Sequence, residues 1–174
     1  MKKKASIGII IGNRDFFPDK LVAEARKEVI EQFEKLQLNY VILGAEDTKL
    51  GGVETFKDAQ KCADLFKKHA DEINGVLVIL PNFGDERGVA ETLKLADLNV
   101  PVLIQAYPDE LTKLDVARRR DSWCGKISVC NNLYQYGIKY TLTDKHVLHP
   151  KDPAFAKELT DFVAVCRVVQ GLRK

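Results

Sequence analysis

Short apolar runs and longer amphipathic stretches alternate along the chain. Residues 6–11 and 76–80 are continuous apolar runs rich in β-branched side chains, which is typical of strands buried on both faces. Shorter runs at 40–43 and 102–104 predict two more strands, and 139–142 is a candidate fifth.

Between these runs, apolar side chains recur at the spacing of amphipathic helices. The predicted helices are 18–36, 54–73, 85–98, 122–136 and a last one that begins at 152–153. Gly75 is predicted to end the second helix and Gly137 to cap the fourth. The fourth helix rests on Trp123, Ile127, Cys130 and Tyr134, which are spaced four, three and four. Asp152 as N-cap and Pro153 at the first helical position mark the start of the last helix.

Strands that alternate with long helices predict an α/β fold. We expect a doubly wound three-layer sandwich with a mainly parallel sheet, of the Rossmann or flavodoxin kind. The length of 174 residues and the lack of repeats or low-complexity linkers predict one domain, 1–174. The last helix either packs as a terminal helix or leads into a further domain.

Composition narrows the function. The net charge is +2 with both signs interspersed, which argues against a nucleic-acid partner. Lys2, Lys3 and Lys4 are predicted to form a solvated tail. No apolar run has the length of a membrane span or of a signal peptide, so we expect a soluble, cytoplasmic protein without membrane contact. The four cysteines are scattered and are expected to be reduced thiols, with Cys62 and Cys166 in the core.

Ligands of open parallel sheets bind beyond the carboxyl ends of the strands. Three loops, 12–17, 81–87 and 105–108, meet there and mix polar side chains with aromatic rings. Such a mixture suits a sugar, which needs hydrogen bonds for its hydroxyls and flat apolar surfaces for its C–H faces.

Individual residues at this edge leave alternatives open. Arg14 contacts a ligand or pairs with a neighbouring carboxylate, Asp15 or Glu86. Asn82 and Asp85 each contact a ligand or cap the next helix. Gln105 either contacts a ligand or braces a loop, and packing is favoured over ligand stacking for Phe16 and Phe17.

Other chemistries fit less well. The first loop lacks the glycines of a dinucleotide site, the lysine of a phosphate-binding loop and the Ser/Thr run of a flavin-phosphate loop. Arg118, Arg119 and Arg120 precede a helix start, where a solvated basic turn is favoured over an anion site. Cys124 has no histidine beside it in sequence, and His146 with His149 makes a poor metal site. The sequence shows no metal cluster and no nucleophile–base pair.

Four separated segments resemble the L-fucose isomerase-like proteins, in the order found in that family. They are residues 12–18 (GNRDFFP), 81–86 (PNFGDE), 119–132 (RRDSWCGKISVCNN) and 166–173 (CRVVQGLR). The resemblance covers essentially the whole chain and points to the N-terminal domain of such a protein.

The resemblance implies a ketose–aldose isomerase of carbohydrate metabolism with a three-domain subunit. In that family a Glu, an Asp and a His bind a divalent metal ion, usually Mn²⁺, and all three would lie beyond this sequence. The first domain contributes to self-association and reaches into the active site of a neighbouring subunit. An arginine after the first strand acts there, and Arg14 matches it; Asn82 and Phe83 are expected to help bind the sugar.

The resemblance therefore implies no catalytic residue within the chain itself. We expect the chain alone to be inactive, as one part of an enzyme. The alternatives are a free-standing small-ligand or regulatory α/β domain and, less in keeping with the loops, a nucleotide or flavin binder.

Overall fold

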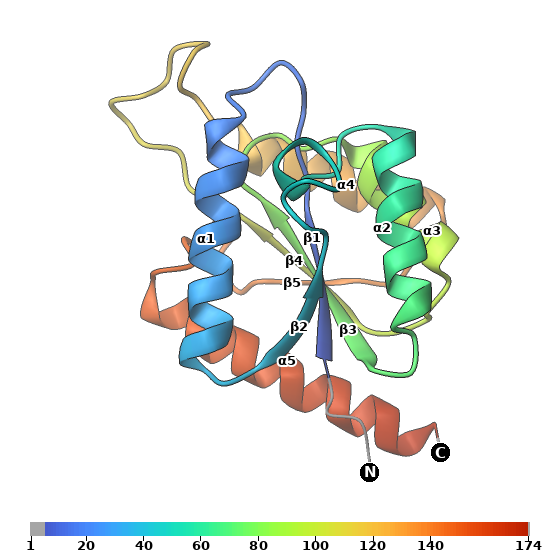
Figure 1. The fold of residues 1–174 in the computed structure, drawn as a ribbon. Coiled ribbons are helices and arrows are strands. Elements are labelled where there is room, and N and C mark those ends of the chain that lie inside the picture. Colours follow the sequence, from blue (N-terminus) through green and yellow to red (C-terminus); the bar gives the residue numbers. More distant parts are fainter. Residues whose placement is uncertain (1–5, 174) are drawn as a thin grey trace.

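A five-stranded parallel sheet forms the centre of the protein (Figure 1). The computed structural model describes residues 6–173, so the predicted lysine tail at 2–4 lies outside the described residues. The strands are β1 (Ser6–Ile11), β2 (Asn39–Ile42), β3 (Ile73–Leu80), β4 (Val102–Ala106) and β5 (Thr141–Leu142). Their order is β2-β1-β3-β4-β5 and every pair is parallel. The predicted α/β fold is confirmed.

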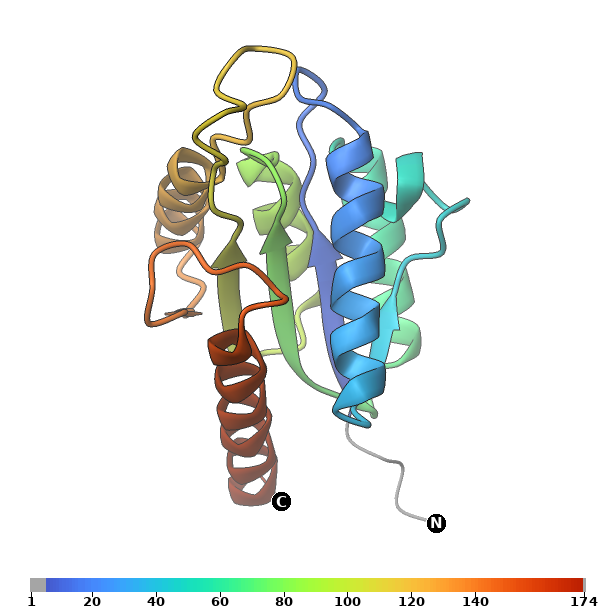
Figure 2. The same ribbon diagram turned by 90° about the vertical axis from the view of Figure 1, so that its left-hand side faces the viewer.

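Helices cover both faces of the sheet (Figures 1 and 2). The helices are α1 (Lys20–Lys35), α2 (Phe56–Lys68), α3 (Glu86–Ala96), α4 (Ser122–Gln135) and α5 (Pro153–Leu172), with a short 3₁₀ turn, η1 (Lys49–Gly51). Helices α1 and α5 share one hydrophobic core with Ile9 and Ile11. Helices α2, α3 and α4 share the other core with Ile10. Successive strand residues thus point to opposite layers, which is why the strands read as unbroken apolar runs.

The boundary between α2 and β3 differs from the prediction. Gly75 does not end the helix; α2 ends at Lys68, and β3 begins at Ile73. A Cβ atom at Gly75 would lie 2.3 Å from the Sγ atom of Cys166 in α5. The glycine therefore lets α5 approach the sheet. The prediction that it ends a helix was wrong.

Helix α4 is present as predicted, but its apolar spacing marks the outer side. Trp123, Ile127 and Tyr134 are all exposed. The side against the sheet consists of the buried residues Ser122, Gly125, Lys126, Val129 and Leu133.

The predicted helix signals at Gly137 and Asp152 are confirmed. Gly137 follows α4 with a φ of 70°, and the Asp152 side chain accepts a hydrogen bond from the Ala154 N–H at 2.9 Å. None of the helices described between residues 6 and 173 combines the length and apolar character needed to cross a bilayer.

Candidate functional site

The strand order creates a binding position where the sheet reverses its direction of growth. The chain moves from β1 outward to β2, returns to β3 on the other side of β1, and then continues to β5. The loops after β1 and β3 lead to helices on opposite faces, and ligands of such sheets bind in the crevice between those loops. Asn13 lies just after β1 and Asn82 just after β3, so both amides lie at this switch point.

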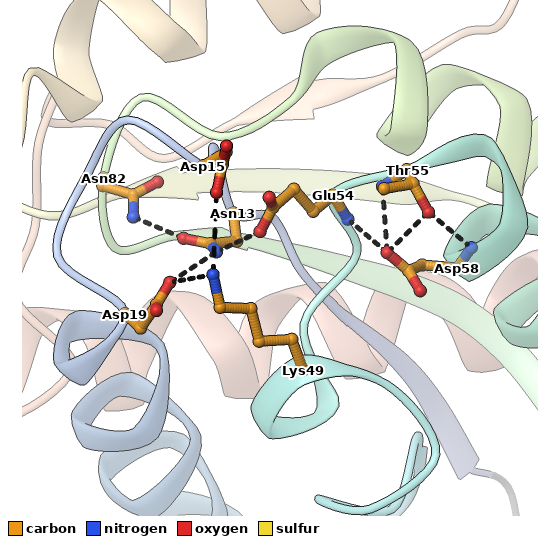
Figure 3. Close-up of polar contacts among 8 residues, drawn as sticks. All are labelled: Asn13, Asp15, Asp19, Lys49, Glu54, Thr55, Asp58 and Asn82. Carbon is orange, nitrogen blue, oxygen red and sulfur yellow. Dashed lines mark hydrogen bonds and ion pairs between the residues drawn. The ribbon is translucent and has the colours of Figure 1, made fainter.

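Asn13 is the centre of a buried hydrogen-bond network (Figure 3). Its Nδ2 donates to Glu54 Oε2 at 2.6 Å and to Asp19 Oδ1 at 3.4 Å. Its Oδ1 accepts from Asn82 Nδ2 at 2.7 Å. The Oδ1 of Asn82 accepts from the N–H of Gly84 at 3.0 Å. Both amides are buried with donors and acceptors engaged, so they lock the two loops together.

Backbone pairing explains why Glu54 reaches this network. The Val53 N–H donates to the Ile11 carbonyl at 2.8 Å, and the Asn13 N–H donates to the Val53 carbonyl at 2.9 Å. The segment before α2 thus pairs with the chain just after β1. A capping box at the start of α2 fixes the next residues (Figure 3), and Glu54 is held between the two.

The network carries its own cation. Lys49 Nζ lies 2.9 Å from Asp19 Oδ1 and 3.7 Å from Asp15 Oδ1, and the hydrogen bond to Asp19 raises the pKa of Lys49. Burial raises the pKa of Glu54, although Asn13 and Lys49 both favour its charged form. The cluster is therefore an ion-paired structural network at the edge of the switch point.

This cluster does not fit the Mn²⁺ ion that the resemblance implies. Mn²⁺ requires several oxygen or imidazole ligands, but the Lys49 ammonium lies against Asp15 and Asp19, and the amide of Asn13 takes up Glu54 (Figure 3). Across residues 6–173, no three His, Cys, Asp or Glu side chains are grouped so as to hold a metal ion.

Two of the predicted sugar-binding residues, Arg14 and Phe83, lie in contact. The guanidinium carbon of Arg14 is 4.9 Å from the centre of the Phe83 ring, and Arg14 Nη1 donates to Glu86 Oε2 at 2.6 Å. Phe17 stacks on the same ring with centroids 6.2 Å apart and planes 17° apart. The Arg14 side chain is 40% exposed, and its one hydrogen bond to the Glu86 carboxylate uses only one of the five N–H donors of a guanidinium.

Helix α4 supports the Phe83 loop from the side. A Cβ atom at Gly125 would lie only 1.8 Å from the Phe83 carbonyl oxygen, so only glycine permits this approach. Just before the helix, the guanidinium carbon of Arg119 lies 5.8 and 5.9 Å from the ring centres of Phe16 and Phe17. The basic turn therefore packs against the aromatic loop after β1.

The three arginines before α4 are occupied within the chain. Arg118 pairs with Asp115, and Arg119 Nε lies 3.0 Å from Asp121 Oδ2. Arg120 is buried, and its Nη1 donates to the Pro81 carbonyl at 2.9 Å. These contacts account for the basic run as a structural feature.

A second polar cluster follows β4. The Tyr107 hydroxyl donates to Glu28 Oε2 at 2.9 Å, and Lys151 Nζ lies 2.9 Å from Glu28 Oε1. Burial raises the pKa of Glu28, but the hydrogen bonds from Lys151 and Tyr107 outweigh it, and the net pKa is lowered. His149 Nε2 is 3.6 Å from the same carboxylate, and burial lowers the pKa of His149. This cluster ties α1 to the loops around β4.

Gln105 braces a loop in the same region. Its Nε2 donates to the Leu148 carbonyl at 2.5 Å. Asp85 caps α3, because its side chain accepts from the Gly88 N–H at 2.6 Å. Gln105 thus braces a loop and Asp85 caps a helix, which are the structural alternatives given for them above.

A hollow of about 410 Å³ lies between the C-terminal end of α3 and the segment that follows α4, away from the switch point. It opens beside Val76 and Val102, near the amino ends of β3 and β4. Because ligands of parallel sheets bind at the carboxyl ends, and because no reactive group of the switch point lines this hollow, we assign the candidate site to the switch point.

Comparison with known proteins decides the family. The model of the fucose/sulfoquinovose isomerase N-terminal domain matches residues 8–173. The chain belongs to this family. A search among curated proteins found no match.

The family assignment confirms the resemblance seen in the four sequence segments. In this isomerase-family domain, Arg14, Asn82 and Phe83 all lie around the switch point, and their binding roles stay predictions. Sequence reasoning missed the network partners Asp19, Lys49 and Glu54, because nothing in the spacing of these residues signals that they converge. The pairing of the segment at Val53 with the end of β1 brings Glu54 in, and it is visible only in three dimensions.

Proposed function

We propose that the chain is the sugar-binding and self-associating N-terminal domain of a ketose–aldose isomerase of carbohydrate metabolism. The observation that carries the proposal is the contact of Arg14 with Phe83 at the switch point, beside the Asn13–Asn82 pair, in a domain of the fucose/sulfoquinovose isomerase family. A guanidinium beside an aromatic ring offers hydrogen-bond donors for hydroxyls and an apolar surface for a sugar C–H face.

Arg14, Phe83 and Asn82 have different roles in this proposal. Arg14 is anchored through one nitrogen to Glu86 and remains 40% exposed, so it supplies donors to the sugar. Phe83 supplies the ring and is itself stacked on Phe17. Asn82 is fully buried and engaged at both ends, which suits it to hold the Phe83 loop in place.

The chemistry of isomerisation belongs to other parts of the enzyme in this proposal. A metal ion such as Mn²⁺, if held by those parts, would supply polarisation of the substrate oxygens, and carboxylates there would transfer the protons. The residues described between 6 and 173 offer no ligand set for that ion, so this chain contributes binding and positioning.

We also propose a cytoplasmic location. All four cysteines are free thiols, as is usual in a reducing compartment, and Cys62 and Cys166 are buried in the core as expected.

Isothermal titration calorimetry tests the binding site. The purified chain is titrated with L-fucose, with its ketose and with sulfoquinovose, and we expect saturable binding of at least one. Arg14→Ala and Phe83→Ala should each weaken that binding at least tenfold. The matched control is Arg167→Ala, an exposed arginine on α5 and outside the three loops, which should leave it unchanged.

In the complete enzyme, Arg14→Ala should raise KM or lower kcat while the fold stays intact. If Arg14→Ala left both the kinetic constants and the sugar affinity unchanged, Arg14 would have only a structural role in its ion pair with Glu86. The proposal would then lose its central binding residue.

A further inference from the structure

The outer face of α4 carries no charged side chain. Its exposed residues are Trp123, Cys124, Ile127, Asn131, Tyr134 and Gln135. The one charged residue in this 14-residue helix is Lys126, which is only 2% exposed. A helix face that remains in water normally carries charge, so this face is unusual.

Helices α1 and α2 of the same molecule provide the comparison. On α1, six of the seven exposed residues are charged: Lys20, Glu24, Lys27, Glu31, Glu34 and Lys35, with Ala23 the exception. On α2, five of seven are charged: Lys57, Lys61, Asp64, Lys67 and Lys68. Depletion of charge and enrichment of aromatic side chains are the marks of the core of a protein interface.

The apolar residues of α4 form one continuous stripe. Trp123, Ile127 and Tyr134 are 38%, 54% and 80% exposed, and their spacing of four and seven puts them on one side of a helix. Half-buried Cys130 lies between them. The stripe follows the helix for about 17 Å, and Figure 2 shows α4, in gold, at the outer flank of the molecule.

We propose that this α4 face, defined as Trp123, Ile127, Asn131, Tyr134 and Gln135, binds the same face of a second copy of this chain across a two-fold axis. The inference rests on the proposed self-association and assigns a surface to it. In such a contact each residue meets the same set of residues on the partner.

The chemistry of the face favours its own copy as the partner. A face without charge brings no like charges together when it meets itself, whereas α1 or α2 would do so. Asn131 and Gln135 each carry both a donor and an acceptor, so each amide is complementary to its own copy. A partner that carried a charged patch would find no counter-charge on this face.

The competing apolar surface, on α5, lacks these properties. Val165, Val168 and Leu172 are exposed there, but the exposed Asp161, which pairs with Lys157, lies on the same side of the helix one turn before Val165. Val168 is therefore the matched control position, since it has the same exposure class and the same aliphatic character as Ile127.

Sedimentation velocity tests the contact on the purified chain at about 1 to about 200 μM, a range suited to a small interface. We expect a reversible monomer–dimer equilibrium for the wild type. Ile127→Glu should be monomeric throughout, because it brings two carboxylates together at the axis, and Val168→Glu should keep the wild-type equilibrium. Circular dichroism and urea denaturation check that both variants are folded.

A mixing experiment tests the two-fold arrangement. Ile127→Lys alone should also be monomeric, and an equimolar mixture of Ile127→Lys with Ile127→Glu should recover the dimer. A wild type that stays monomeric, a dimer lost in Val168→Glu but kept in Ile127→Glu, or no recovery in the mixture would each overturn the proposal. Calorimetric titration of the same samples with sugar distinguishes failure of this proposal from failure of the proposed function. Sugar binding without dimerisation would contradict the α4 contact and leave the proposed sugar site in place.

Discussion

Asn13 and Asn82 act as a pair in which each side-chain nitrogen and oxygen has a hydrogen-bond partner. The Nδ2 of Asn13 donates to Glu54 and Asp19, and its Oδ1 accepts from Asn82, which in turn holds the N–H of Gly84. A buried polar group that loses its partner costs about 1–3 kcal/mol. The pair therefore fixes the loop that carries Phe83 only while both amides are present.

Asn82→Ala should accordingly lower the free energy of unfolding by about 1–3 kcal/mol, because it leaves Asn13 Oδ1 and the Gly84 N–H without their partner. Urea denaturation followed by circular dichroism measures the change. Gln60→Ala, at an exposed position of α2, is the control and should stay within about 0.5 kcal/mol of wild type. If Asn82→Ala and the control had equal free energies of unfolding, the Asn13–Asn82 hydrogen bond would not contribute to stability.

Lys126 gives the second prediction at this scale. Its Nζ donates to Thr143 Oγ1 at 2.8 Å and to the His146 carbonyl at 2.9 Å, and burial lowers the pKa of Lys126 to about 8. Between that value and the ordinary 10.5, the unfolded chain binds more protons than the folded one. This group's contribution therefore makes stability rise with pH from about 8 to about 10.5, by at most about 1.4 kcal/mol per pH unit.

Lys126→Met should remove that contribution. Cysteine and tyrosine side chains also titrate in this range, so the quantity to follow is the difference in unfolding free energy between wild type and variant at several pH values. We expect the wild type to gain on the variant from pH 8 to 10.5 and the difference to be flat below pH 8. A difference that stays constant across the whole range would show that Lys126 has an ordinary pKa in the folded protein.

At the scale of elements, α4 combines one close contact with an exposed apolar face, and its sequence alone reveals neither. Its buried side approaches the Phe83 loop through Gly125, and its outer side carries Trp123, Ile127 and Tyr134. Alanine normally stabilises a helix relative to glycine by about 0.5–1 kcal/mol. At Gly125 the sign should reverse, since the new Cβ atom would collide with the Phe83 carbonyl oxygen.

We therefore expect Gly125→Ala to lower the melting temperature, and to weaken sugar binding if the Phe83 loop moves. Gly171→Ala is the matched control: it is also helical, and a Cβ atom added there would meet nothing within 4 Å, so it should be neutral or slightly stabilising. If both alanine variants were equally stabilising, α4 would have to lie farther from the Phe83 loop than the structure places it.

The same helix shows how far sequence reasoning reaches. Periodicity located the strands and helices because each apolar run or stripe is a local pattern, and the parallel sheet followed from their alternation. Periodicity alone does not say which side of a doubly apolar helix is buried, so the stripe at Trp123, Ile127 and Tyr134 was not recognised as the outer face. Gly75 failed as a helix-stop signal for a related reason, since the need for glycine there comes from Cys166, far away in the chain.

At the scale of the whole molecule, the proposed function gives this chain the binding of the sugar and leaves its transformation to other parts of an isomerase. The switch point supplies Arg14 and Phe83 on a rigid frame, and residues 6–173 contain no set of metal ligands.

We therefore expect the purified chain, with Mn²⁺ added, to show no conversion of L-fucose or sulfoquinovose to a ketose. A colorimetric ketose assay, with a complete isomerase of the family as positive control, measures this, and the calorimetric titration of the same sample separates an inactive binder from a chain that binds no sugar. Metal-dependent ketose formation that disappears with a chelator would place a complete catalytic centre in this chain, and the division between binding here and proton transfer elsewhere would be wrong.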